Sequence, residues 1–342
     1  MTTRTTSEGG RPRGGRGRAE RATGALLNAV GALAPAPAGD LTFLLFRRPL
    51  LRGKVLPAEQ AVHDRAGRDE LLVDGERVVT YRWGDGERPV LMLHGWRSRA
   101  SRFAAFVPRL EALGLSPVSF DAPGHGDSGG SATTILRNVE VARRLQDRYG
   151  AFHSVLAHSF GVTCAYLALR EGVRAERLVA VSGVSHFGFL VEEFGRRLAL
   201  TPRLGDGLRT RVEERLFPEV DDLWSRFDGT WRPAEIGVPT LLIHDEDDPT
   251  VPLRQAHRLR TAHAPHAELT VTTGLGHRRI LAAPAVLAGA LGFLQGTGEA
   301  DSRPAPPRSD PGPASGALPR AGVGSGSGPG PGPGVGSGSG VG

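Results

Sequence analysis

Ser159 is the residue whose neighbours in the sequence point most directly to chemistry. It follows an apolar run at residues 155–157 and precedes a helix-like run at residues 162–170, with the small residues Ala157 and Gly161 two positions away on either side. This pattern is typical of a tight strand-to-helix turn that exposes a nucleophilic hydroxyl. A serine hydroxyl is a weak nucleophile at neutral pH, so it needs a base to take its proton and an acid to orient that base.

Two later segments can supply the base and the acid. The apolar run at residues 240–243 predicts a buried strand, and four acidic residues follow it at positions 245–248. A second predicted strand, residues 269–273, leads into a glycine-containing loop and then His277. Glycines allow that loop to turn the imidazole back over the sheet edge. The order is therefore serine, acid, histidine, with each residue following a predicted strand.

An earlier loop can stabilise the negative charge that forms on the substrate oxygen. Residues 90–93 are apolar and end in His94-Gly95-Trp96. The backbone N–H of Trp96 and that of Phe160, the residue after the serine, are the expected oxyanion-hole donors. Gly95 permits close approach. Losing one such donor typically costs about 3–4 kcal/mol of transition-state stabilisation.

Strands and helices alternate between these motifs, which predicts a mostly parallel sheet covered by helices on both faces. Active sites in such sheets gather at the carboxyl ends of the strands. The expected strands cover residues 78–83, 90–94, 117–121, 154–158, 178–182, 240–244 and 269–273. The expected helices cover residues 101–113, 133–149, 160–171, 253–264 and 281–294.

Five motifs in this order make residues 70–295 resemble the α/β-hydrolase superfamily, most closely its serine esterase and lipase branch. They are His94-Gly95-Trp96, residues 121–128, residues 157–161, residues 244–252 and Gly276-His277. The resemblance implies an α/β-hydrolase fold: a mostly parallel twisted sheet, helices on both faces and a helical cap insertion. Ala157 departs from the family's first glycine. The dehalogenase branch would carry aspartate at position 159, so the resemblance disfavours that chemistry.

The resemblance also assigns the acid of the triad. In the family the acid lies three residues before a Val-Pro pair, here Val251-Pro252, which selects Asp248 with Asp247 as the alternative. The remaining acids are interpreted as solvated loop residues. The implied catalytic residues are thus Ser159, Asp248 and His277.

The resemblance and the composition together suggest five segments. They are a disordered Arg/Gly-rich leader (1–24), an N-terminal helical extension (25–68), a core in two parts (69–183 and 236–296), a helical cap (184–235) and a disordered Gly/Pro/Ser tail (297–342). The cap would roof the triad and line the substrate pocket.

Composition limits the partners of the chain. Residues 1–22 hold six arginines and two glutamates, a charge of +4 out of the +6 of all 342 residues. We interpret this leader as solubilising; contact with nucleic acid or anionic lipid is the alternative, and no specific nucleic-acid partner is expected. One cysteine excludes an internal disulfide, and no apolar run is long enough to span a membrane. Cytoplasmic localisation is predicted, with secretion as the alternative because residues 24–38 partly resemble a signal peptide.

Several residues near the motifs have structural rather than catalytic explanations. We expect His125 to be a hydrogen-bonded loop residue and the side chains of His94 and His158 to point into the scaffold. Asp121 and Asp127 are expected to hold their loop through backbone hydrogen bonds. Further expectations are that Arg97 and Arg99 are solvated, that Cys164 is a small buried hydrophobe, and that residues 41–46 with the arginines after them pack on the body or touch a membrane surface.

The predicted function is a serine hydrolase that cleaves a carboxylic ester or thioester of a small, partly hydrophobic molecule through an acyl-enzyme. No metal or cofactor is expected. Acyl transfer and C–C bond hydrolysis use the same residues and stay open, as does a non-catalytic binder on the same fold. The sequence does not decide the natural substrate or the oligomeric state.

Overall fold

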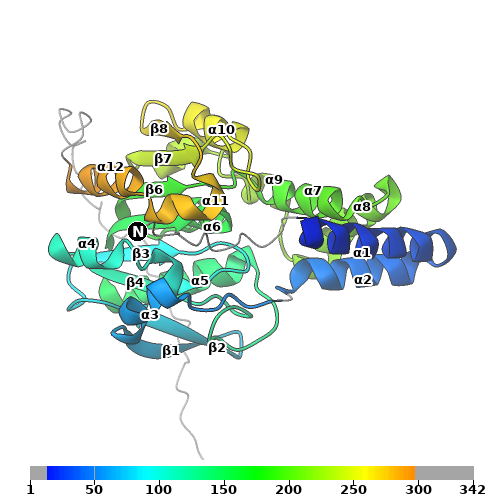
Figure 1. Ribbon diagram of the computed structural model, residues 1–342, viewed down its shortest axis with the longest axis horizontal. Coiled ribbons are helices and arrows are strands. Elements are labelled where there is room, and N and C mark those ends of the chain that lie inside the picture. The colour runs from blue at the N-terminus through cyan, green and yellow to red at the C-terminus, as the bar shows by residue number, and fades with distance from the viewer. Residues whose placement is uncertain (1–13, 50, 297–342) are drawn as a thin grey trace, which may run out of the picture. The chain divides into compact units, whose positions relative to one another are not determined.

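The computed structural model describes residues 14–49 and 51–296, and an eight-stranded sheet forms its centre (Figure 1). The strand order is β1-β2-β4-β3-β5-β6-β7-β8. β2 runs antiparallel to both of its neighbours, and the other pairs are parallel. The strands are β1 (Gly67–Val73), β2 (Glu76–Arg82), β3 (Pro89–Leu93), β4 (Ser116–Phe120), β5 (Phe152–His158), β6 (Ala175–Val181), β7 (Thr240–Asp245) and β8 (Ala267–Thr272).

The predicted fold class and all seven predicted strands are confirmed, with ends that shift by up to three residues. Every residue of β3, β4 and β7 is buried. Burial on both faces is why β3 and residues 241–243 of β7 are continuous apolar runs rather than alternating ones, while β4 includes the buried Ser116 and Ser119. β1 was not predicted, because it is an edge strand whose first six residues are exposed or half-buried and it carries no long apolar run.

Helices cover both faces of the sheet. Apolar side chains of α4 and α12 pack with those of β2 and β3 on one face, and side chains of α5, α6 and α10 form the core of the other. The predicted helix over 101–113 is instead a short 3-10 turn (Ala100–Phe103) followed by α4. The bounds are α4 (Val107–Ala112), α5 (Ile135–Tyr149), α6 (Phe160–Arg170), α10 (Arg254–Ala262), α11 (Gly276–Arg279) and α12 (Pro284–Gln295).

The segment between β6 and β7 is largely helical. It contains α7 (Phe187–Leu198), α8 (Pro202–Arg211), a π-helical turn (Val212–Leu216) and α9 (Leu223–Arg226). Its role as a cap over the active site stays a prediction.

Two N-terminal helices, α1 (Gly14–Leu33) and α2 (Pro35–Arg47), lie beside α7 and α8 (Figure 1). The Asn28 amide of α1 donates to the carbonyl of Ala199 (2.8 Å) and accepts from the N–H of Thr201 (2.9 Å). Asp40 of α2 accepts from Arg211 of α8 (2.8 Å). α3 (Pro57–Asp64) follows.

The expected disorder of residues 1–24 is wrong for residues 14–24, which form the first half of α1. Sequence reasoning missed this because the arginines and glycines at the start of α1 obscure its helical pattern. The rest of the predicted leader and the predicted tail, 297–342, lie outside the described residues.

Arg99 is buried in an ion-pair network, so the expectation that it is solvated is wrong. Its side chain is 5% exposed and donates to Asp121 (3.1 Å) and to Asp127 (2.8 Å). Tyr81 donates to Asp121 (2.9 Å), and the N–H groups of Asp127 and Ala100 also donate to that carboxylate (both 2.8 Å). The network ties β2, β4 and the loop after β3 together. Asp121 holds its loop through backbone hydrogen bonds as predicted, whereas the prediction is wrong for Asp127, whose carboxylate accepts from the side chains of Arg99 and Tyr81.

We expect Arg99→Ala to lower the free energy of unfolding by about 3–5 kcal/mol, because it leaves a buried carboxylate without its partner. Urea denaturation measures this. The matched control is Arg65→Ala, which breaks an exposed pair with Glu111 and should cost about 0–1 kcal/mol. Equal losses for the two variants would mean that the buried network contributes no more than a surface pair.

Candidate active site

Ser159 occupies a strained turn between β5 and α6. Its φ of 58° and ψ of −121° lie in a region that side chains larger than glycine rarely adopt, at a typical cost of about 1–3 kcal/mol. Hydrogen bonds with the next strand hold it there: the Ser159 N–H donates to Val181 (3.1 Å), and the Ser159 carbonyl accepts from Val184 (3.2 Å). The turn therefore aims the hydroxyl away from the sheet.

Two glycines allow other backbone to approach this turn. A Cβ at Gly161 would lie 2.1 Å from the carbonyl oxygen of Leu93, and one at Gly95 would lie 2.8 Å from the Ser159 Cβ. Larger residues at either position would push the turn away from β3 and its loop. The absence of a side chain at Gly95 thus allows the loop after β3 to lie close to Ser159.

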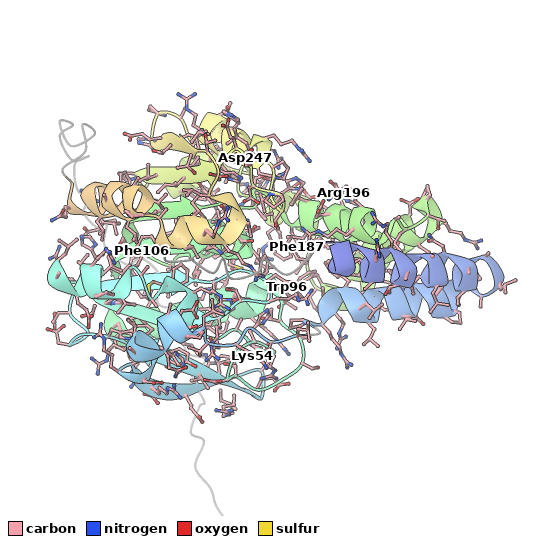
Figure 2. All side chains as sticks on the ribbon, in the orientation of Figure 1. Lys54, Trp96, Phe106, Phe187, Arg196 and Asp247 are labelled. Atoms are coloured by element: carbon pink, nitrogen blue, oxygen red, sulfur yellow. The ribbon has the colours of Figure 1, made fainter. Side chains whose placement is uncertain are left out.

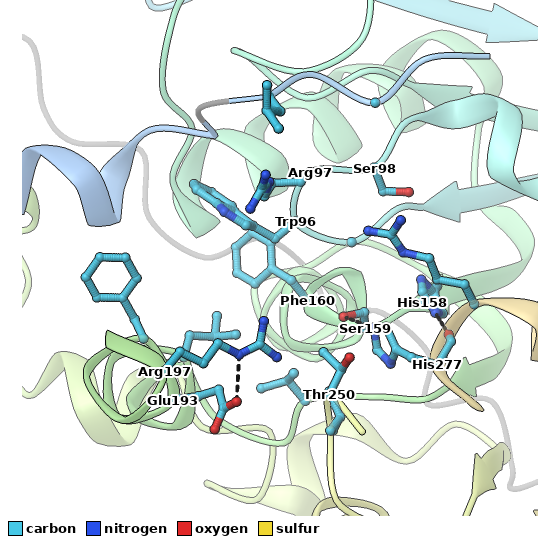
Figure 3. Close-up of a pocket in the computed structure, with 18 of the residues that line it drawn as sticks. Trp96, Arg97, Ser98, His158, Ser159, Phe160, Glu193, Arg197, Thr250 and His277 are labelled. Carbon is cyan, nitrogen blue, oxygen red and sulfur yellow. Dashed lines mark hydrogen bonds and ion pairs between the residues drawn. The ribbon is translucent and has the colours of Figure 1, made fainter. Parts of the chain in front are cut away.

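The structure brings Ser159, His277 and Asp248 into one hydrogen-bonded chain at the carboxyl ends of β5, β7 and β8. His277 Nε2 lies 3.0 Å from the Ser159 Oγ, and His277 Nδ1 lies 2.7 Å from the Asp248 Oδ2. Ser159 and His277 face each other in Figure 3. In this geometry the imidazole can accept the serine proton while its other nitrogen donates to the carboxylate.

Asp248 is stabilised as an anion. Burial by itself would raise the pKa of this carboxyl, but the hydrogen bond from His277 and those from the N–H groups of Val251 (3.0 Å) and Thr250 (2.8 Å) outweigh burial and hold its pKa below the ordinary value. Asp248 therefore stays charged throughout the physiological range.

The other three acids of this loop hold the histidine loop rather than the imidazole. Asp245 accepts from the N–H groups of Gly276 (2.9 Å) and Leu275 (3.0 Å), and Asp247 accepts from that of Gly274 (3.0 Å). Glu246 accepts from the Thr273 hydroxyl (2.7 Å). Asp245 is buried, so its expected role as a solvated loop residue is wrong, whereas Glu246 and Asp247 are exposed as expected.

Asp245 is the positioning residue that sequence reasoning did not single out. Burial would raise its pKa, but the N–H of Gly276 and the Thr272 hydroxyl lead the hydrogen bonds that keep it below its usual value. The available signal was an acid at the end of β7, facing the glycine-containing loop after β8.

The predicted oxyanion donors lie beside the serine. Phe160 is the first residue of α6, and the first N–H groups of a helix have no partner inside it. The two side chains are in edge contact, with ring centroids 6.2 Å apart. The role of the two N–H groups as oxyanion donors stays a prediction.

The histidines next to the site form hydrogen bonds with backbone groups of the scaffold, as predicted. The His94 Nδ1 donates to the Gly95 carbonyl (2.8 Å), while its Nε2 accepts from the N–H of Ala122 (3.0 Å). His158 donates to the His277 carbonyl (2.8 Å), so it supports the loop that carries the imidazole. His125 donates to the Pro123 carbonyl (3.1 Å).

The buried histidines should make the fold sensitive to acid. Burial lowers the pKa of His125 and of His158 to about 3, whereas a histidine in the unfolded chain titrates near 6.5. As the pH falls below about 6.5, these two histidines become protonated in the unfolded chain but stay neutral in the folded chain. The free energy of unfolding therefore decreases.

Each such histidine contributes a slope of at most about 1.4 kcal/mol per pH unit. We expect the thermal midpoint, followed by circular dichroism, to fall between pH 7 and pH 5. The thermal midpoint of His125→Gln should fall less than that of the wild type over the same pH range, because one buried histidine no longer contributes to the pH dependence. If the thermal midpoint of the variant falls as much as that of the wild type, the lowered pKa of His125 does not contribute to the acid sensitivity.

A cavity of about 1530 Å³ opens in front of Ser159. Trp96, from the loop after β3, and Phe187, from α7, both line it (Figure 2). Its other apolar lining includes Phe46, Phe160, Val184, Phe189, Leu190 and Phe194. Basic side chains outnumber acidic ones in the wall: Arg47, Arg48, Arg52, Lys54, Arg97, Arg102, Arg197, Arg278 and Arg279, against Glu20, Glu193 and Asp247. Both α1 and α2 contribute to this wall.

Within residues 14–49 and 51–296, no group of three His, Cys, Asp or Glu side chains is arranged to hold a metal ion. Cys164 is buried, as predicted for a small hydrophobe.

No described helix is both long enough and apolar enough to cross a bilayer. Localisation in the cytoplasm stays a prediction.

Comparison with known proteins supports the same fold. Residues 90–290 match the model of a family described as the alpha/beta hydrolase family. Alpha/beta hydrolase domain-containing protein 10 from mouse is similar, with a TM-score of 0.54 and 15% identity over 68% of this chain and 98% of that one. An esterase of Pyrococcus furiosus has a TM-score of 0.54 and 20% identity over 73% of this chain and 96% of that one. No curated protein matches by sequence.

Proposed function

The chain belongs to the alpha/beta hydrolase family, and we propose that it is a serine hydrolase that cleaves a carboxylic ester or thioester. The observation that carries this proposal is the unbroken hydrogen-bond chain from Ser159 through His277 to Asp248. A protein that only binds its ligand does not require a strained serine hydrogen-bonded to a histidine.

In the first half-reaction, His277 takes the proton of Ser159 as the Ser159 Oγ attacks the carbonyl carbon of the substrate. The C–O or C–S bond to the leaving group breaks when the tetrahedral intermediate collapses, and His277 gives its proton to that group. The N–H groups of Trp96 and Phe160 stabilise the oxyanion. Asp248 orients the imidazole and stabilises its protonated form.

In the second half-reaction, water attacks the acyl-enzyme. His277 accepts a proton from the water, a second oxyanion forms in the same hole, and the Ser159 oxygen leaves with the proton returned by His277. The acid product and the free serine result. The apolar lining of the cavity favours a substrate with a hydrophobic part, and its basic side chains favour negative charge elsewhere on the molecule.

The test is to detect the acyl-enzyme. We expect p-nitrophenyl esters and acyl thioesters to give a burst of leaving group close to one equivalent per chain when deacylation is slow. Mass spectrometry of the digested protein should find the acyl group on the peptide that contains Ser159. The substrate series should include esters with a terminal carboxylate.

Other outcomes separate the alternatives. Transfer of the acyl group to an added alcohol in preference to water would favour an acyltransferase. Cleavage of a 1,3-diketone without ester turnover would favour a C–C hydrolase. A folded protein that binds esters but never acquires the acyl group would support the non-catalytic binder.

A further inference from the structure

Exposed large apolar side chains gather on the N-terminal helices. Nine such side chains are exposed among the described residues, and seven of them lie between residues 26 and 56. The remaining two, Leu72 and Val271, lie on β1 and β8. Five of the seven lie on α1 and α2, namely Leu26, Val30, Leu33, Leu41 and Leu44, whereas Leu51 and Leu56 follow α2 and line the cavity in front of Ser159. An exposed apolar cluster on an otherwise polar surface marks an interaction site.

On α1 these side chains form one stripe. Leu26, Val30 and Leu33 are spaced by four and three residues, which places them on one face of a helix, and they are 63%, 36% and 90% exposed. The opposite face is buried against α7 and α8: Gly24 lies against the backbone of Leu198, and Leu27 packs in a cluster with side chains of both helices. The stripe therefore points away from the rest of the molecule.

The exposed side chains of α2 point away from α8 in the same manner. Leu41 and Leu44 are 43% and 37% exposed, while Ala38, Thr42 and Phe43 are buried. Because α1 and α2 pack side by side against α7 and α8 (Figure 1), their outward faces form one surface. We call the side chains of Leu26, Val30, Leu33, Leu41 and Leu44 the hairpin surface.

The charge around the hairpin surface is positive. Residues 17–54 contain six basic and two acidic side chains. Arg18 and Arg21 lie on α1, whereas Arg47, Arg48, Arg52 and Lys54 lie at or after the end of α2 and line the cavity. One of those acids, Asp40, is paired with Arg211 and Arg215 of the neighbouring segment. Arg18 and Arg21 are exposed on α1, the helix that carries Leu26, Val30 and Leu33. A second copy of this chain would bring like charges together. An anionic bilayer has negatively charged headgroups for the arginines and a hydrocarbon interior for the leucines.

We propose that the α1–α2 hairpin docks on the surface of an anionic membrane, with the leucines of the hairpin surface inserted among the lipids and the arginines against the headgroups. Apolar burial and attraction of basic side chains to anionic lipid are the two contributions that hold such helices at an interface. The docking is peripheral, since none of the described helices can span a bilayer.

The hairpin also lines the cavity in front of Ser159, through Thr23 on α1 and Phe46 on α2. Docking would therefore place that cavity near the lipid surface. This consequence rests on the proposed function, but the docking itself does not.

The test is co-sedimentation of the full-length protein with vesicles. We expect binding to vesicles that contain phosphatidylglycerol and much weaker binding to pure phosphatidylcholine. The double variant Leu26→Gln/Leu33→Gln should bind at least about a hundredfold more weakly, since each of the two inserted leucines contributes about a factor of ten or more. Arg21→Gln should weaken binding to the anionic vesicles about fivefold.

Leu72→Gln is the matched control, because Leu72 is 65% exposed but lies on β1; its binding should equal that of the wild type. Circular dichroism establishes that each variant is folded. The proposal is overturned if the folded wild type stays in the supernatant with both vesicles, or if Leu72→Gln weakens binding as much as the double variant. It is also overturned if the wild type is a dimer that the double variant dissociates, because a second copy would then cover the hairpin surface. If the folded wild type binds the vesicles but hydrolyses no ester or thioester, the proposed function alone is contradicted and the docking proposal stands.

Discussion

Ser159→Ala should abolish labelling by a fluorophosphonate probe and reduce ester turnover by about 10⁶-fold, the loss typical when the nucleophile of a serine triad is removed. The physical reason is specific to this position. The Ser159 hydroxyl is 3.0 Å from His277 Nε2, and a strained turn holds it at the cavity. Alanine keeps the backbone and removes the only atom that the imidazole can deprotonate.

Stoichiometric labelling, measured by intact-protein mass spectrometry, checks this result. Ser131→Ala is the control, since Ser131 is exposed on a loop and its removal should leave the labelling unchanged. Labelling of folded Ser159→Ala would show that another residue is the nucleophile. Absence of labelling in the folded wild type would mean that the triad does not activate its serine, and the binder alternative would gain.

Asp248→Asn should lower kcat by about 10⁴-fold, whereas Asp247→Asn should change it by less than about tenfold. Asparagine has the shape of aspartate, but it can present an N–H to His277 Nδ1, which favours the wrong imidazole tautomer. Among the described residues, the Asp247 carboxylate accepts from the N–H of Gly274 (3.0 Å) and not from His277. Its loss should loosen the histidine loop without changing the tautomer.

Steady-state kinetics on one activated ester compares the two variants. The pair is matched because both changes replace one charged group with a neutral group of the same size in the same loop. A loss of about 10⁴-fold in Asp247→Asn and not in Asp248→Asn would reverse the assignment of the acid. Equal small losses would mean that the imidazole needs neither carboxylate.

Much of the fold could be predicted from local sequence, because buried parallel strands are apolar runs and each motif directly follows one. Thus β3, β5 and β7 were visible before the structure, together with the turn at Ser159. β1 was not visible, because edge strands do not need apolar residues on both faces. The start of α1 was also missed, since glycine and arginine next to a low-complexity segment indicate disorder more strongly than helix.

The sequence by itself determined which residue types follow which strands, and hence that a serine, a group of acids and a histidine would meet at one edge of the sheet. The family resemblance selected Asp248 with Asp247 as the alternative, and the tertiary structure places the Asp248 carboxylate against the imidazole. Residue types alone do not separate the acids at positions 245–248, because their distances from the imidazole depend on how β7 and β8 pair. Only the tertiary structure decided that Arg99 is buried between Asp121 and Asp127, and that α1 and α2 turn their leucines outward. These outcomes depend on contacts between residues far apart in the chain, and neither spacing nor composition records such contacts.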